Sequence, residues 1–226
     1  PSGTMVHRLT TSLITRPEPS PLANFFEHRQ PPPAFGLGLL ERVPDAEILS
    51  REDPTDANGD GIKGRANRLA DGRIGRLGWK ANVPNLAEFS RDALFNELGL
   101  TLPMQAGLSF GSMVDDDAVA DPELAVSQVE ALTFFMQSLA PPPRTRTDVA
   151  KEDRGQALFG TAKCDACHVP SLRTSDGVMA RAYTDLLLHE IVPATTKGIG
   201  DAARPREFRT TPLWGVSKTA PYLHDG

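Results

Sequence analysis

The sequence predicts a mostly α-helical protein with long ordered loops and little sheet. Three observations support this fold class. Apolar residues recur at helical spacing in several segments. The chain of 226 residues contains Gly 19 and Pro 20, a content that favours many loops between short helices. Runs that alternate between polar and apolar residues are too short for a substantial sheet.

The first third of the chain is predicted to be loop-rich. Residues 1–35 are expected to be irregular because prolines interrupt them, as in the PPP stretch at Pro31–Pro33. A short helix is predicted over Val43–Asp53, with a proline near its first turn. A loop rich in Asp, Asn and Gly follows at Asp53–Asn67.

Two helices are predicted in the middle of the chain. Asn85–Leu100 has apolar residues at helical spacing. A longer helix is expected from Asp121, as its N-cap, to Leu139. Its apolar stripe is expected to pack in the core and consists of Leu124, Val129, Leu132, Phe135, Met136 and Leu139.

A stiff, polar linker, APPPRTRTD, is predicted at Ala140–Asp148 and suggests two domains, residues 1–145 and 146–226. After it, VAKEDRGQALFGTAKCDACH is expected to form a helix that runs into a cysteine motif. A last helix is predicted near Tyr183–Glu190.

Charge and hydropathy limit the possible partners. The net charge of −5 gives no reason to expect nucleic acid or an anionic membrane as a partner. No apolar run approaches the length of a membrane span. The chain begins at Pro1 and stops at Gly226 inside what resembles a motif, so both ends are expected to be cut from a larger polypeptide.

The stretch KCDACH (Lys163–His168) contains both of the chain's cysteines. Four interpretations compete. A thioredoxin-like redox pair would follow a strand, and the preceding residues are helical in pattern. A structural zinc site needs four ligands, and two thiols with His168 give three. Two unrelated free thiols are the simplest alternative, and the fourth is C-x-x-C-H, the attachment signature of c-type haem.

The haem interpretation explains both the spacing and the adjacent histidine. Cys164 and Cys167 would form thioethers with haem, and His168 could ligate the iron. Covalent haem would imply a periplasmic or otherwise exported protein. The sixth iron ligand would decide between closed electron transfer and an open, reactive iron. The sequence does not choose among its candidates, which are His189, His224, Met104, Met113, Met136 and Met179.

The loop that contains Asp56, Asn58 and Asp60 resembles the first half of a calcium-binding loop, with Gly61 at the sharp turn. Asn67 occupies the twelfth position, where a bidentate Glu is usual, so any calcium binding is expected to be weaker. An Asx-rich turn without metal is the alternative.

The last segment, EFRTTPLWGVSKTAPYLHDG (Glu207–Gly226), offers an arginine that could pair with a haem propionate, Arg209, and an aromatic that could wall the haem, Trp214. It resembles a segment of the bacterial di-haem cytochrome c peroxidase superfamily. The similarity is greatest to the branch of di-haem oxidoreductases, also called thiol oxidoreductases. GQALF (Gly155–Phe159) resembles the helix that precedes the haem motif in many class I cytochromes c. Further motifs resemble the branch in order: FGLGLLERVPDAEIL, DANGDGIKGRANR, GRLGWKANVPNL, NELGLT and YTDLLLHE.

This resemblance implies cytochrome c-like haem domains, a peroxide-reactive N-terminal haem and a C-terminal haem that passes electrons to it. The roles that it implies for this chain are as follows: the electron-transfer haem at Cys164, Cys167 and His168, a bridging Trp79, a distal acid at Glu97, carbonyl ligands to an inter-haem calcium at Thr219 and Pro221, and His224 lining the haem environment.

The sequence departs from the family in three ways. It has no first C-x-x-C-H, it ends before the expected sixth ligand of the C-terminal haem, and Leu98 stands where relatives usually have Met. Two hypotheses follow. The chain is part of a di-haem enzyme that uses peroxide or another small oxidant and a partner redox protein, or it is a non-enzymatic electron-transfer cytochrome with one haem. The oligomeric state is not predicted.

Overall fold

The computed structural model describes residues 21, 29–115, 117–144, 146–193 and 204–226. Packing divides the chain into two units, each treated by itself below. Of the described residues, the first unit contains mainly Asn85–Phe135, and the second contains residues 29–84 and Met136–Gly226. This division does not test the haem-domain boundary predicted after residue 145, which stays a prediction. Most of the segment predicted to be irregular at the N-terminus lies outside the described residues.

The first unit is built around the predicted helix at 85–100. The side chain of Asn85 accepts a hydrogen bond from the backbone N–H of Glu88 and thereby caps α3 (Leu86–Asp92). The helix continues as a π-helical turn, η1 (Ala93–Glu97). Leu94 packs there with Leu102 and Val129, and Phe95, Leu100, Leu124 and Leu132 surround them. The predicted helix is therefore confirmed.

The next helix, α4 (Val126–Ser138), begins later than predicted. Asp121 is not its N-cap, because the Asp121 carboxylate accepts a hydrogen bond from the Thr101 hydroxyl and Glu123 accepts one from the Thr101 backbone. Asp115, Asp121 and Glu123 gather their carboxylates within 4.8 Å of one another around this turn. The predicted apolar stripe is only partly correct, since Val129 is buried but Phe135 is 56% exposed.

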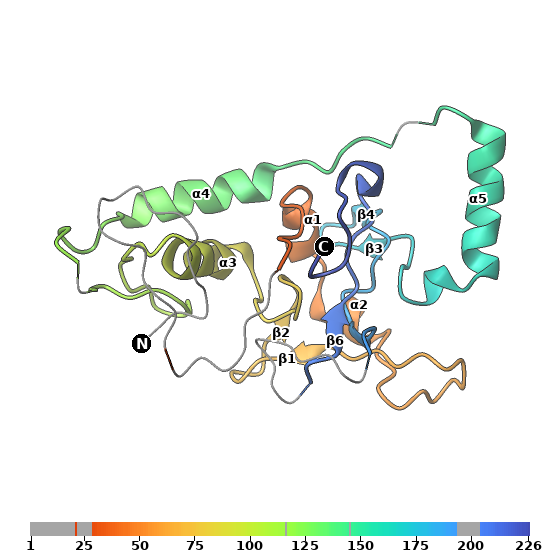
Figure 1. Cartoon of the computed structure of the whole chain (residues 1–226), viewed down its shortest axis with the longest axis horizontal. Helices are drawn as coiled ribbons and strands as arrows, with labels where there is room; N and C mark the ends of the chain where they lie inside the picture. Colours follow the sequence, from red (N-terminus) through yellow and green to blue (C-terminus); the bar gives the residue numbers. More distant parts are fainter. Residues whose placement is uncertain (1–20, 22–28, 116, 145, 194–203) are drawn as a thin grey trace. The chain divides into compact units, whose positions relative to one another are not determined.

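Among its described residues, the second unit contains four short helices and one longer helix (Figure 1). The short ones are α1 (Leu37–Glu41), α2 (Asp45–Leu49), η2 (Cys164–Ala166) and η3 (Val216–Lys218), and the longer one is α5 (Val149–Thr161). The helix predicted over 43–53 is confirmed in its central part by α2. Asp148 caps α5 by accepting from the N–H of Lys151, and the helix leads into the cysteine motif as predicted.

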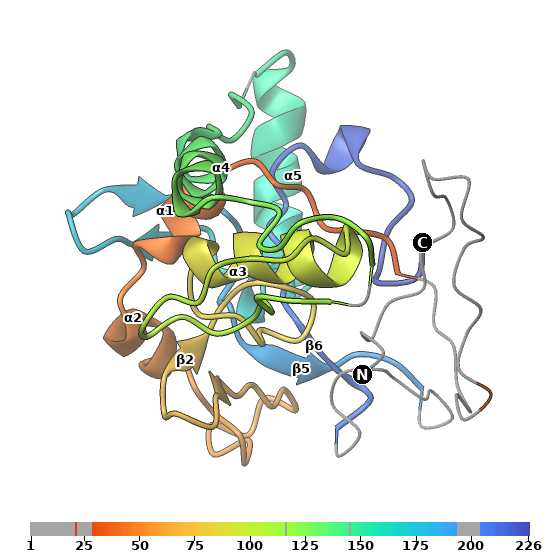
Figure 2. The same cartoon turned by 90° about the vertical axis from the view of Figure 1, so that its left-hand side faces the viewer.

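Sheet is limited to three antiparallel pairs in the part of the chain that the structure describes. They are β1 (Asn67–Arg68) with β2 (Ile74–Gly75), β3 (Leu172–Arg173) with β4 (Met179–Ala180), and β5 (Leu188–Glu190) with β6 (Glu207–Arg209). Strands β5 and β6 lie side by side in Figure 2, with His189 opposite Phe208.

The helix predicted near Tyr183–Glu190 is wrong. The hydroxyl of Thr184 accepts from the N–H of Leu186, and the carboxylate of Asp185 accepts from the N–H of Leu187. These local bonds stabilise a turn in place of a helix. The end of the segment then pairs as β5.

The core of the second unit collects aliphatic side chains from α1, α2 and the extended segments. Its fully buried members include Leu40, Val43, Ile48, Leu77, Leu172, Leu186, Leu187 and Phe208. Lys80 is buried among them, where its ammonium group donates to the carbonyls of Pro205 and Glu207 and lies 3.7 Å from the centre of the Phe208 ring.

The predicted small amount of sheet is confirmed for the described residues. Helix exceeds strand, but loops connect nearly all the elements, so the mostly α class holds only loosely. The cytochrome c-like fold stays a prediction. Among the described residues, no helix is both long enough and apolar enough to cross a membrane.

Candidate functional site

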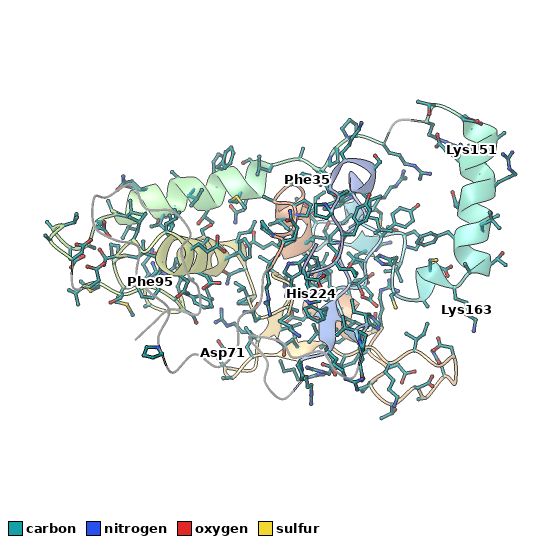
Figure 3. All side chains as sticks on the ribbon, in the orientation of Figure 1. Phe35, Asp71, Phe95, Lys151, Lys163 and His224 are labelled. Carbon is teal, nitrogen blue, oxygen red and sulfur yellow. The ribbon has the colours of Figure 1, made fainter. Side chains whose placement is uncertain are left out.

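The cysteine motif is presented at the end of a helix. After α5, Lys163 adopts a left-handed backbone conformation with φ 60°, which turns the chain into η2. The N–H of His168 then donates to the carbonyl of Cys164 at 2.9 Å. Cys164 is exposed and Cys167 is half-buried, and both thiols are free. Figure 3 labels Lys151 and Lys163, which lie toward the two ends of α5.

His168 has a defined orientation. Its Nδ1 lies 2.8 Å from the carbonyl oxygen of Tyr183. A carbonyl oxygen can only accept, so Nδ1 carries the proton and the neutral ring keeps the lone pair of Nε2. This tautomer is the one that a histidine needs in order to give Nε2 to a metal.

The backbone around Tyr183 is held against the motif. The N–H of Thr184 donates to the carbonyl of Val169 at 3.1 Å. The ring of Phe159, on α5, meets the ring of Tyr183 edge to face. Contacts on both sides of His168 thus join α5 and the cysteine motif to the segment that sequence reasoning took for a helix.

His189 and Asp185 form a buried pair beside the motif. Nε2 of His189 lies 2.8 Å from the Asp185 carboxylate and Nδ1 lies 2.9 Å from the carbonyl of Lys63. Burial by itself would lower the pKa of His189, but its bonds to Asp185 and to the Cys167 sulfur outweigh burial and raise the pKa to about 10. The ring is therefore protonated at neutral pH, and both nitrogens donate.

This arrangement bears on the sixth iron ligand. To give a ring nitrogen to iron, His189 would have to lose its bond to the Asp185 carboxylate or to the carbonyl of Lys63. The sulfur of Cys167 lies 3.7 Å from Nδ1 of His189, which places His189 next to a thiol of the motif. Its observed contacts favour a supporting role around the motif over ligation. The backbone approaches the ring closely at Gly64, where an added Cβ would lie 2.8 Å from Cε1 of His189.

An open hollow lies beside the cysteine motif. Its volume is about 630 Å³. Its lining comes from three places in the second unit: Ser50, Arg51, Glu52, Asp53, Ala57 and Asn58, then Ala166 and Val169, and finally Asp185. Ala166 and Val169 flank Cys167 and His168, so a group attached to the motif would have open space next to it.

Arg209 and Trp214 make protein contacts in this structure. Arg209 is fully buried, and its guanidinium donates to the carbonyls of Gly78 and Thr210. Burial lowers the pKa of Arg209 to about 10, although the negative charge of Asp185 opposes the shift. Trp214 donates through Nε1 to the carbonyl of Arg181. The predicted roles of both residues toward haem stay predictions.

His224 belongs to an aromatic cluster. Its ring lies 4.0 Å from the Phe208 ring, centre to centre, and 6.5 Å from the Trp79 ring in an edge-on arrangement. The Nε1 group of Trp79 donates to the carbonyl of Gln30. Figure 3 shows His224 amid the side chains of the second unit. The structure thus brings together Trp79 and His224, which the resemblance had assigned to different roles.

The loop with Asp56, Asn58 and Asp60 is folded by its own hydrogen bonds. The carboxylates of Asp56 and Asp60 accept from the N–H groups of Gly61 and Ile62. The amide nitrogen of Asn67, at the twelfth position, donates to the carbonyls of Lys80 and Ala81, away from the loop.

The remaining predicted residues lie in varied surroundings. Thr219 is half-buried after η3 and Pro221 is exposed. Glu97 is the exposed last residue of η1 and belongs to the first unit. Of the candidate methionines, Met104, Met113 and Met179 are exposed, and Met136 is half-buried.

Sequence reasoning missed Tyr183, Thr184 and Asp185 as residues that surround the motif. A signal was present, because Thr and Asp side chains often bond to backbone N–H groups two residues ahead and so favour turns. Instead, a helix is predicted from the sequence near Tyr183–Glu190.

A pair of free thiols followed by an oriented histidine defines a candidate site for haem attachment, and one comparison names the class. A family model described as "Di-haem oxidoreductase, putative peroxidase" matches residues 25–226. The chain therefore belongs to the di-haem oxidoreductase family. Haem is the cofactor that this family implies, with redox chemistry of the peroxidase type. Neither a comparison with curated proteins nor one with solved structures returned a match.

Proposed function

We propose that this chain carries the electron-transfer haem of an oxidoreductase of the di-haem cytochrome c peroxidase type. Haem would be attached covalently through Cys164 and Cys167, and His168 would give its Nε2 to the iron. The observation that carries the proposal is the contact of 2.8 Å between Nδ1 of His168 and the carbonyl of Tyr183, next to two free thiols. Family membership supports it independently.

The residues present fit haem c in three respects. Each thiol is accessible enough to add to a vinyl group, since Cys164 is exposed and Cys167 is half-buried. Nε2 of His168 is left for the iron by the bond at Nδ1. The hollow beside Ala166 and Val169 offers open space next to the motif. Bound haem would supply a centre that accepts and releases one electron at a time.

The protein would control the surroundings of this centre. His168 holds its proton on Nδ1 against Tyr183, which keeps Nε2 basic. The protonated His189 places a positive charge beside Cys167, and Asp185 balances it. Because the ring nitrogens of His189 already form these contacts, we expect the sixth iron ligand to be His224 or one of the methionines.

The peroxidase half of the proposal rests on the family resemblance. In it, Glu97 would move the proton needed for cleavage of the oxygen–oxygen bond of peroxide, Trp79 would mediate between the two haem sites, and a second haem would supply the peroxide-reactive centre. The proposed cytochrome c-like fold of the haem domains and the proposed calcium site at Thr219 and Pro221 also rest on the family resemblance. A partner redox protein would exchange electrons with the haem at Cys164 and Cys167. Covalent haem attachment further implies a periplasmic or otherwise exported protein.

The first experiment tests haem attachment. The protein is expressed in a bacterial host that matures c-type cytochromes, and its pyridine haemochrome spectrum is recorded after denaturation. We expect a c-type spectrum that the double variant Cys164→Ser/Cys167→Ser loses. Thr161→Ser, an exposed change three residues before Cys164, is the matched control. A wild-type protein without covalent haem would contradict the proposal.

The second experiment separates the enzyme from a simple electron carrier. The natural polypeptide, matured in the same host, is assayed for peroxide consumption with a chemical reductant, and its ferric spectrum is recorded. We expect peroxide consumption, a high-spin ferric component and a strong loss of activity in Glu97→Gln. A low-spin spectrum with no peroxide consumption would establish the electron-transfer cytochrome in place of the enzyme.

A further inference from the structure

We propose that Thr184 is the positioning residue that keeps the Tyr183 carbonyl on Nδ1 of His168 and thereby sets the reduction potential of the attached haem. The inference rests on the proposed haem site and goes beyond it, because it names the side chain that holds the orienting carbonyl. Thr184 is completely buried. The hydrogen bonds of its hydroxyl go to Thr210 and Leu186, so Thr184 would act on His168 through the neighbouring Tyr183.

The hydroxyl of Thr184 forms hydrogen bonds with two backbone groups from different segments. It donates to the carbonyl of Thr210 at 2.6 Å and accepts from the N–H of Leu186 at 3.0 Å. The N–H of Thr184 donates to the carbonyl of Val169, the residue after His168. Thr184 therefore connects three parts of the second unit: the cysteine motif, its own turn, and the chain that follows β6.

The backbone on both sides of Thr184 is strained. Tyr183 has φ 53° and Leu186 has φ 63°, which is the left-handed region that residues with a Cβ seldom adopt. Such conformations persist only where surrounding contacts enforce them. The bonds of the Thr184 hydroxyl span this strained turn, and Leu213 donates to the carbonyl of Ala182 on its other side.

The strained conformation of Tyr183 has a direct consequence for His168. It aims the Tyr183 carbonyl at Nδ1, and a firm bond there makes the imidazole a stronger electron donor through Nε2. A stronger donor favours ferric over ferrous iron and lowers the reduction potential. Without the Thr184 hydroxyl, Tyr183 would relax toward ordinary φ values, the bond would lengthen, and the potential would rise.

The test compares three variants of the haem-loaded protein. Thr184→Val removes the hydroxyl while keeping the shape, and Thr184→Ser restores the hydroxyl. Thr174→Val is the matched control, because Thr174 is also buried and its hydroxyl also donates to a backbone carbonyl, that of Val178, in the β3–β4 turn. Reduction potentials are measured by spectroelectrochemical titration, and exchange of the His168 Nδ1 proton is measured by NMR.

We expect Thr184→Val to raise the reduction potential, and a tenfold shift of the iron site toward the ferrous state corresponds to a rise of about 59 mV for a one-electron couple. We also expect exchange of the His168 Nδ1 proton to become at least tenfold faster. Thr184→Ser and Thr174→Val should keep the wild-type potential and exchange rate. An unchanged potential in Thr184→Val, or an equal shift in Thr174→Val, would overturn the inference.

The proposed function and this inference can fail separately. Absence of covalent haem in the wild type would refute the haem site. The role of Thr184 can still be tested on the chain without haem, because the contact between His168 and the Tyr183 carbonyl is present there. NMR of that chain should show the proton on Nδ1 in the wild type and its loss of protection in Thr184→Val. If Thr184→Val does not fold, Thr184→Ala takes its place with the same expected results.

Discussion

The ring of Phe159 meets the ring of Tyr183 edge to face, with centroids 5.6 Å apart and planes at 84°. Phe159 lies on α5, a helix without a fully buried residue. Tyr183 is the residue whose carbonyl orients His168. One aromatic contact therefore connects the helix that presents the thiols with the turn that orients the histidine.

This contact predicts a measurable loss of stability in Phe159→Leu. The variant keeps an apolar side chain but loses the edge-to-face interaction, which is worth about 0.5–1.5 kcal/mol beyond burial. We expect the free energy of unfolding of the haem-loaded protein to fall by about 1 kcal/mol in urea denaturation. Gln156→Ala, an exposed change on the same helix, should stay within about 0.5 kcal/mol of the wild type. Equal stability of Phe159→Leu and Gln156→Ala would show that the ring contact does not anchor α5.

The His189–Asp185 pair predicts a pH dependence of stability. The pKa of His189 is raised from its ordinary value of 6.5 to about 10 in the folded protein, so folding favours the protonated form. The stabilisation is fully present below about pH 6.5. It is lost as the pH rises toward about 10, at no more than about 1.4 kcal/mol per pH unit for one proton.

The check is the free energy of unfolding measured from pH 6 to pH 10. We expect Asp185→Asn to flatten the decline, since it removes the charge that favours the protonated ring while keeping a side chain of the same shape. Thioether formation at Cys167 reduces the sulfur's share of the shift but leaves that of Asp185. A decline as steep in Asp185→Asn as in the wild type would contradict this account.

Arg91 predicts a strong effect in the first unit. It is completely buried, and its guanidinium donates to the carbonyls of Ser109 and Phe110 and to the side chain of Gln105. Burial lowers the pKa of Arg91 and the nearby Glu88 opposes that shift. Replacing it by Met leaves these buried acceptors without their donor, which should cost about 3 kcal/mol of stability.

Hydrogen exchange provides the local measurement for Arg91→Met. Amide protons at residues 105–111 should exchange faster, because the guanidinium is what holds these backbone carbonyls. Arg154→Met, at an exposed position of α5, is the control and should leave the same amides unchanged. Unaltered protection of this loop in Arg91→Met would rule out the proposed role.

Calcium binding at the loop of Asp56, Asn58 and Asp60 is predicted to be weak. Position twelve is Asn67 in place of a bidentate Glu, and its amide nitrogen donates to the carbonyls of Lys80 and Ala81, away from the loop. The strong twelfth ligand of a calcium loop is therefore missing. We expect a Kd of about 10⁻⁴–10⁻³ M by isothermal titration calorimetry, in the range of low-affinity calcium modules.

A pair of variants assigns the calcium signal to the loop. Asp60→Asn should weaken binding at least tenfold, because it removes one formal charge from the ligand set. Asp71→Asn changes an exposed carboxylate that pairs with Arg73 outside the loop and should leave binding as it is. Heat signals that respond equally to both changes would indicate nonspecific binding of calcium to surface carboxylates.

Local chemistry made several elements predictable from the sequence. Asn85 and Asp148 cap α3 and α5 through their own side chains, so the starts of both helices could be recognised. The spacing of Cys164, Cys167 and His168 likewise identified the candidate haem motif before any fold was known. Such features depend on residues within a few positions of one another, and a single sequence contains that information.

Contacts between distant segments decided the rest. Asp121 is predicted to be an N-cap, but its carboxylate accepts a hydrogen bond from the hydroxyl of Thr101, twenty residues earlier. The helix α4 begins later, at Val126. A helix is predicted near Tyr183–Glu190, yet Thr184 bonds to Thr210 and β5 pairs with β6. Strand pairing and long-range hydrogen bonds override local propensity, since the propensity difference per residue is small.

The sequence by itself determined the chemistry of the motif: two thiols and a histidine at the spacing that suits haem c. Only the tertiary structure decided which ring nitrogen of His168 carries the proton, because the acceptor of Nδ1 is the Tyr183 carbonyl, fifteen positions away along the chain. It likewise placed the ring of His189 against the carboxylate of Asp185. A side chain's identity defines what it can donate or accept, but its partner depends on the packing of segments that are remote in sequence.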